Sequence, residues 1–234
     1  MPLPKLTAPT YTLTLPSVDK KVKYRPFVVK DEQVLLTAME SGDEEHMLNA
    51  IRDVVQSCTF DKLDVNNLPQ FDLEYVFLRI RAKSVGETST INVLCPDDEK
   101  TYVPVTLNLE EIECHVDDTH DNNIKLTDSV GIILGYPNYE TIKSLAGKTL
   151  NSELVLDIVK KSIVQVYDGD TVYELSDFTE KELDEFLSGF TTEALKKIKT
   201  FFDTMPRLRH EIEVENPDTK VKSKVVLEGL RSFF

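Results

Sequence analysis

The stretch that decides the fold is residues 71–107, which reads FDLEYVFLRIRAKSVGETSTINVLCPDDEKTYVPVTL. Its first part predicts a helix over residues 71–84, and apolar side chains cover much of the circumference of this helix. Two β-rich runs follow, Thr88–Cys95 and Thr101–Leu107, and the Pro96-Asp97-Asp98-Glu99 segment between them predicts a hairpin. A helix that is apolar on most sides is buried, so this unit belongs at the centre of the protein.

The same order of elements occurs again in residues 191–227. Thr191 or Thr192 caps a helix there, and Asn216-Pro217-Asp218-Thr219 forms the turn of a second hairpin. A Pro-Asp dipeptide therefore lies in both turns. Two interpretations stay open: the segments are copies of a degenerate internal repeat, or both simply use the commonest hairpin chemistry.

The remaining pattern predicts an α+β fold with about seven helices, segregated antiparallel β-hairpins and two helix–hairpin units. Apolar residues at three- and four-residue steps predict a helix over 43–58. A longer helix is expected from Asn151 or Ser152 through Ile163 and Val166, and Thr179 with Glu182 has the capping-box form. We expect two lobes: an N-terminal α+β lobe over residues 1–136, and a helical lobe over residues 137–234 that ends in a β-hairpin.

Charge and composition exclude several classes of protein. The 234 residues include 27 Lys and Arg against 41 Asp and Glu, a formal net charge of −14. A phosphate-tracking nucleic-acid binder needs a basic surface, so we expect no nucleic-acid partner. The sequence contains no apolar run of about 18 residues, so no membrane span is expected, and the first residues do not form a secretory signal. Three sparse cysteines indicate a reducing compartment.

One group of residues has the chemistry of zinc ligands. Cys95, Cys114, His115 and His120 lie within 26 residues of sequence, but no C-x₂-C pair is present. Cys114 and His115 are adjacent, so on a strand they face opposite sides. Buried thiols and solvent-facing histidines are the alternative interpretation. We therefore expect neither a metal nor a cofactor.

Motifs of enzymatic catalysis are missing from the sequence. It contains no G-x-S-x-G, no G-x-G-x-x-G and no phosphate-binding loop among its eight glycines. None of the four histidines is tied by a motif to a serine or a cysteine. We therefore predict no catalytic residues and no enzymatic activity.

Several segments carry a resemblance to a known family. They are Leu15-Pro16-Ser17, residues 22–32 (VKYRPFVVKDE), residues 35–41 (LLTAMES), residues 71–75 (FDLEY), residues 80–87 (IRAKSVGE), Cys95-Pro96, and residues 227–234 (LEGLRSFF). Together they resemble the T4-type bacteriophage baseplate hub proteins over nearly the whole chain.

The resemblance implies a non-enzymatic structural subunit of the hub at the centre of a contractile-tail baseplate. Such a late viral protein is made in the host bacterial cytoplasm and becomes part of the virion tail. Its partners would be other phage baseplate hub or tail proteins. An assembly factor of the same baseplate, which acts as a chaperone and is not retained in the virion, is the alternative. An unrelated acidic adaptor or enzyme is the third class.

Two surface segments are candidates for contact with partners. Tyr24, Arg25, Pro26 and Phe27 combine an arginine with aromatic side chains, the composition enriched at the energetic centres of interfaces. Phe233 and Phe234 end the chain and are expected to dock into a partner's groove. The alternatives are an ordinary half-buried strand for the first segment, and a tail folded onto its own core for the second.

Overall fold

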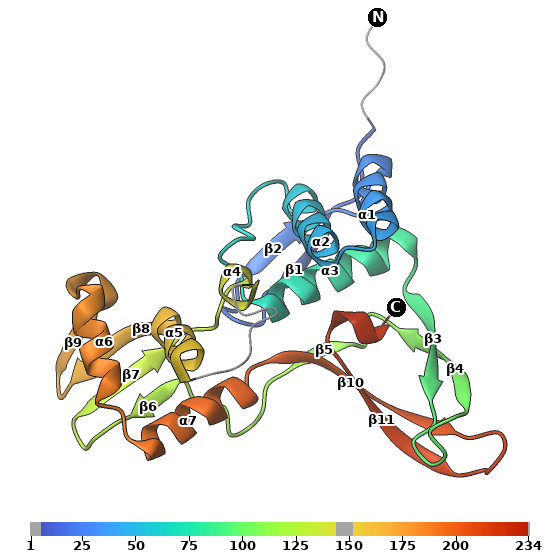
Figure 1. The fold of residues 1–234 in the computed structure, drawn as a ribbon. Coiled ribbons are helices and arrows are strands. Elements are labelled where there is room, and N and C mark those ends of the chain that lie inside the picture. Colours follow the sequence, from blue (N-terminus) through green and yellow to red (C-terminus); the bar gives the residue numbers. More distant parts are fainter. Residues whose placement is uncertain (1–5, 144–151, 234) are drawn as a thin grey trace, which may run out of the picture. The chain divides into compact units, whose positions relative to one another are not determined.

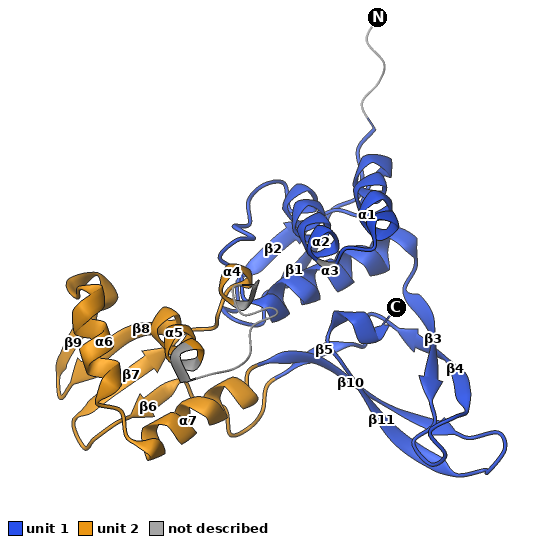
Figure 2. Ribbon diagram, in the orientation of Figure 1, with its two compact units in different colours: residues 1–115, 206–234 blue, residues 116–205 orange. Residues whose placement is uncertain are grey.

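A computed structural model describes residues 6–143 and 152–233 (Figure 1). Its contacts divide the chain into two compact units, coloured separately in Figure 2. Unit 1 comprises Met1–His115 and Pro206–Phe234, and unit 2 comprises Val116–Met205. Both units combine helices with small antiparallel sheets, so the predicted α+β class is confirmed.

Seven α-helices occur in the described part of the chain, in agreement with the expected number. None of them is long and apolar enough to cross a membrane. The helices are α1 (Val29–Ser41), α2 (Glu44–Cys58), α3 (Gln70–Val85), α4 (Tyr139–Lys143), α5 (Ser152–Ser162), α6 (Glu180–Ser188) and α7 (Thr192–Asp203), with short 3₁₀ helices η1 (Leu175–Asp177) and η2 (Leu230–Phe233).

In the part of the chain that the structure describes, the strands form four small sheets, and every pairing is antiparallel. In unit 1 the sheets are β1-β2, β3-β4 and β11-β10-β5, and in unit 2 the sheet is β6-β7-β8-β9. The strands are β1 (Tyr11–Thr14), β2 (Lys21–Tyr24), β3 (Thr88–Leu94), β4 (Tyr102–Asn108), β5 (Glu113–His115), β6 (Asn123–Lys125), β7 (Val130–Leu134), β8 (Ile163–Asp168), β9 (Thr171–Glu174), β10 (Arg207–Glu215) and β11 (Lys222–Glu228).

The division into units differs from the predicted boundary between residues 136 and 137. The chain leaves unit 1 after His115 and returns at Pro206, where β10 pairs with β5 so that Leu208 lies opposite Cys114. The C-terminal hairpin therefore belongs to the same unit as the first three helices. A pairing between strands more than ninety residues apart leaves no local signal in the sequence.

Helix α3 lies in the core of unit 1, as its sequence predicts. Val76, Leu78 and Ile80 are fully buried, and Gly86 follows the helix at a φ of 141° that a side chain would disfavour. Helix α2 buries Val54, Val55 and Cys58 against the same core. Cys58 thus acts as a small apolar core residue.

Unit 2 has a core of its own between its sheet and its helices. Ile132 of β7, Val159 of α5 and Phe201 of α7 are its most deeply buried members. Thr179 and Thr191 begin helices α6 and α7 by accepting hydrogen bonds from the backbone N–H groups of Glu182 and Ala194. The predicted caps at these two threonines are therefore confirmed.

Candidate functional site

The two hairpins of unit 1, β3-β4 and β10-β11, have turns that begin with the same geometry, although the first turn is one residue longer. In the first turn the N–H of Glu99 donates to the carbonyl of Cys95 at 3.0 Å, and in the second the N–H of Lys220 donates to Asn216 at 2.9 Å. Glu99 and Lys220 both have left-handed backbones, with φ of 53° and 62°. The shared Pro-Asp dipeptide therefore occupies the same place at the start of both turns.

The strands on either side of these turns correspond as well. Below the first hairpin the N–H of Leu109 donates to Glu87 at 2.8 Å, and below the second Gly229 donates to Leu208 at 3.0 Å. The side chains that point inward are identical at four positions and alternate with exposed ones. The inward pairs are Ile91 and Ile212, Val93 and Val214, Val105 and Val225, and Leu107 and Leu227.

The tips of the two hairpins are joined by side-chain hydrogen bonds, which we call the tip clasp. The amide of Asn216 donates to both carboxylate oxygens of Asp97 at 3.1 Å, and the hydroxyl of Thr219 donates to Asp97 at 2.5 Å. Asn216 is fully buried, and its own oxygen accepts the N–H of Asp218 at 2.9 Å. A buried amide with its donor and acceptor both satisfied orients the two tips specifically.

Two further residues shape the first tip. The carboxylate of Asp98 accepts from the hydroxyl of Thr101 at 2.6 Å and from the N–H groups of Thr101 and Lys100. These hydrogen bonds hold the pKa of Asp98 well below its usual value. Cys95 is fully buried, and its burial and the nearby carboxylates raise the pKa of its thiol, so the sulfur stays protonated.

The structure does not gather the four residues considered as zinc ligands. Cys95 lies at a hairpin tip, whereas Cys114 and His115 are neighbours on β5, and burial raises the pKa of the Cys114 thiol to about 12. His120 belongs to unit 2, where its ring bonds Thr204 and Tyr136 at 2.9 and 3.0 Å. Among the described residues, no group of three or more His, Cys, Asp or Glu side chains is placed to hold a metal ion.

The first candidate interface segment faces the core of unit 1. Tyr24 is only 4% exposed, and Phe27 stacks on Phe77 with ring centroids 6.5 Å apart. Arg25 donates to Asp31 at 2.7 Å and to the hydroxyl of Ser57 at 2.8 Å. The arginine and the aromatic rings therefore contact the protein itself.

Asp31 shows how tightly this segment is held. Burial raises its pKa, but hydrogen bonds from Arg25, Val28 and Ser57 outweigh burial and hold the pKa below its usual value. Val28 is the N-cap of helix α1, and the Asp31 carboxylate accepts the Val28 N–H at 2.9 Å.

The C-terminal candidates are described in part. Phe233 lies in η2 with none of its surface exposed, and Leu230 beside it is also buried. Phe234 lies outside the described residues. The described end of the chain thus packs onto the core of unit 1.

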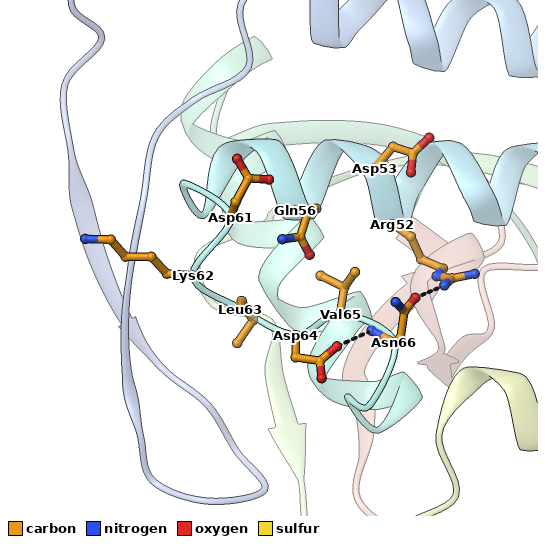
Figure 3. Close-up of a pocket in the computed structure, with 9 residues that line it drawn as sticks. All are labelled: Arg52, Asp53, Gln56, Asp61, Lys62, Leu63, Asp64, Val65 and Asn66. Atoms are coloured by element: carbon orange, nitrogen blue, oxygen red, sulfur yellow. Dashed lines mark hydrogen bonds between the residues drawn. The ribbon is translucent and has the colours of Figure 1, made fainter.

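A depression of about 500 Å³ lies between the end of α2 and the loop that follows it (Figure 3). Its lining includes residues of both charges. Arg52 donates a hydrogen bond to the side chain of Asn66, and the N–H of Asn66 donates to the carboxylate of Asp64 at 3.3 Å. Lys62 points away from these groups in Figure 3. The depression contains neither a cysteine nor a serine nor a histidine, so its lining offers no nucleophile paired with a base.

The described residues thus form an α+β protein with two packed cores and a hydrogen-bonded tip clasp, and they contain no group placed to hold a metal ion. A comparison with protein families then identifies the group: the family described as T4 bacteriophage base plate protein matches residues 8–234. The chain therefore belongs to this family of baseplate proteins. No curated protein and no solved structure gives a significant match.

Proposed function

We propose that this chain is a non-enzymatic structural subunit of the baseplate hub of a contractile phage tail, and that it acts through protein–protein interfaces during tail assembly. The observation that carries the proposal is the family match, which spans residues 8–234. The buried, protonated thiols of Cys95 and Cys114 support it, because neither sulfur is a ready nucleophile or metal ligand.

The proposed location is the virion tail, after synthesis in the host bacterial cytoplasm. The free cysteines of unit 1, Cys58, Cys95 and Cys114, accord with a reducing compartment. The net charge of −14 keeps the subunit soluble before assembly and disfavours DNA as a partner. The proposed partners are other baseplate hub or tail proteins of the same phage.

Quantitative mass spectrometry of purified phage particles tests the proposal. A structural subunit is recovered in a fixed ratio to the other baseplate proteins. Recovery from infected cells but not from particles would instead identify an assembly factor that leaves the baseplate.

The interface role of Tyr24, Arg25, Pro26, Phe27, Phe233 and Phe234 stays a prediction. Pro26 and Phe27 are partly exposed, so a partner reaches them most easily. Phe27→Ala is the most informative variant. Its affinity for each purified baseplate protein is measured, and the midpoint of its unfolding shows whether it is folded. An unchanged affinity in a folded variant would contradict the role of this segment.

A further inference from the structure

The alternation of hydrogen bonds identifies the outer edge of β3. The N–H of Cys95 donates to Thr101 at 2.8 Å and that of Leu109 to Glu87 at 2.8 Å, so odd-numbered residues of β3 bond to β4. In an antiparallel pair the alternate residues direct their N–H and C=O groups the other way. The outward groups of β3 therefore belong to Thr88, Thr90, Asn92 and Leu94.

Three of the four hairpin edges are protected against further pairing. Strand β10 pairs with β5 at Arg207–Arg209, and the rest of its outer edge carries Glu211, Glu213 and Glu215. On β11 the outer edge has Lys222 and Lys224, and on β4 it has Pro104, which lacks an N–H. Charge, proline and a covering strand are the devices by which proteins block strand edges.

Strand β3 has none of these protections. It contains neither a charged residue nor a proline, and in the described part of the chain β4 is the only strand that pairs with it. Thr88, Thr90 and Asn92 are exposed, and Leu94 is 38% exposed. A seven-residue, uncharged and unpaired edge is a template for an added strand.

The outward faces of the two hairpins also differ in charge. The face of the second is almost entirely charged, at Arg209, Glu211, Glu213, Glu215, Lys222, Lys224 and Glu228, with Val226 as the exception. The corresponding residues of the first are all uncharged, namely Thr88, Thr90, Asn92, Leu94, Tyr102, Pro104, Thr106 and Asn108. An uncharged face loses little when a partner excludes water from it.

We propose that the outer edge of β3 binds an extended, uncharged segment of another baseplate protein, which adds to the β3-β4 hairpin as a third strand. The second hairpin shows the kind of occupant, because there an extended segment, β5, pairs with Arg207–Arg209 at the start of the corresponding edge of β10. The inference rests on the proposed baseplate function, which supplies the partner. Backbone hydrogen bonds to β3 would hold the added strand, and the side chains of Thr90 and Asn92 would lie beside the side chains of that strand.

The two hairpins provide matched variants for the test. T90E/N92E places on β3 the residues that β10 has at equivalent positions, and the β10 backbone accommodates them in the same geometry. T90P removes one outward N–H without adding charge. T90V controls for the hydrogen bond between the Thr90 and Thr106 hydroxyls, and E211T/E213N controls for changes on the other hairpin.

The binding assay is surface plasmon resonance of the full chain against each purified baseplate protein of the encoding phage, one at a time. We expect one partner whose affinity falls at least about tenfold in T90E/N92E and in T90P, but stays within about twofold in both controls. Circular dichroism confirms that each variant is folded.

Each other outcome contradicts a stated part of the proposal. Unchanged affinity in both β3 variants would overturn it while leaving the baseplate function intact, whereas a wild-type chain that binds no baseplate protein would contradict the proposed function itself. A loss of affinity in T90E/N92E but not in T90P would show that the partner binds the outward face of the first hairpin and not the backbone edge of β3. A wild-type dimer by light scattering that T90P dissociates would show that a second copy occupies the edge.

Discussion

The hairpins β3-β4 and β10-β11 have a Pro-Asp dipeptide at the same place in their turns and identical residues at four inward positions, yet they differ at every outward position. Inward positions are constrained by packing, which penalises the loss of even one methylene group. Outward positions are free to differ, and in the second hairpin they form ion pairs such as Lys224–Glu211 at 2.6 Å. The contrast separates what folds the hairpin from what is available to a partner.

The largest expected effect tests the shared inner face. Leu107→Ala and Leu227→Ala should each lower the free energy of unfolding by about 2–5 kcal/mol, because both side chains are buried at equivalent positions. Urea denaturation followed by circular dichroism measures the change. Val226→Ala, at an exposed outward position, is the control. A loss below about 1 kcal/mol at either leucine would show that its hairpin is not packed as described.

The tip clasp is asymmetric, and Asp97 and Asp218 test this asymmetry. Asp97 accepts hydrogen bonds from Asn216 and Thr219, whereas the carboxylate of Asp218 accepts none in the described part of the chain. Asp97→Ala should destabilise the protein by about 1 kcal/mol, and Asp218→Ala should change stability less. Equal thermal shifts in the two variants would contradict the clasp.

Acid should weaken the first turn more than the second. Hydrogen bonds hold the folded pKa of Asp98 below the ordinary value of 3.8, so its stabilising contribution is present above that pH and is lost as the pH falls below it. Thr219 occupies the equivalent position and does not titrate. Asp98→Thr should therefore make the free energy of unfolding fall less steeply between about pH 4 and about pH 2. Parallel curves for the two proteins would argue against a role for Asp98.

The smallest effect is expected on the charged outer face. Glu211→Thr with Glu213→Asn removes two exposed ion pairs, so stability should change by less than about 0.5 kcal/mol and become less dependent on salt. Thermal unfolding at low and high ionic strength measures this change. A loss of several kcal/mol would mean that the outer face also determines the fold.

Local patterns were sufficient where neighbouring residues define an element. The turn residues predicted both hairpins, and the strands of the first begin and end within one residue of the expected positions. The prediction of a helix through Ile163 and Val166 was wrong at its end: both β-branched residues lie in β8, where they pair with Leu134 and Ile132 of β7. Apolar periodicity alone does not separate a helix from a buried strand in so short a run.

The candidate sites depended on residues far apart in the sequence. Arg25 beside aromatic residues has the composition of an interface, but its hydrogen-bond partners Asp31 and Ser57 lie six and thirty-two residues away. The exposed edge of β3 was equally hidden, since the hairpin signal says nothing about which edges remain unpaired. The sequence offers one signal for this edge. When the two hairpins are compared position by position, only the second has charged outward residues.

The sequence by itself determined the α+β class, the helical stripes, the capped helices and the two Pro-Asp hairpins, because each of these follows from interactions within a few residues. Only the tertiary structure decided that the C-terminal hairpin joins the N-terminal unit, that Asn216 clasps Asp97, and that β3 keeps an open edge. These features arise from contacts between distant segments, whose closure depends on the packing of the whole unit.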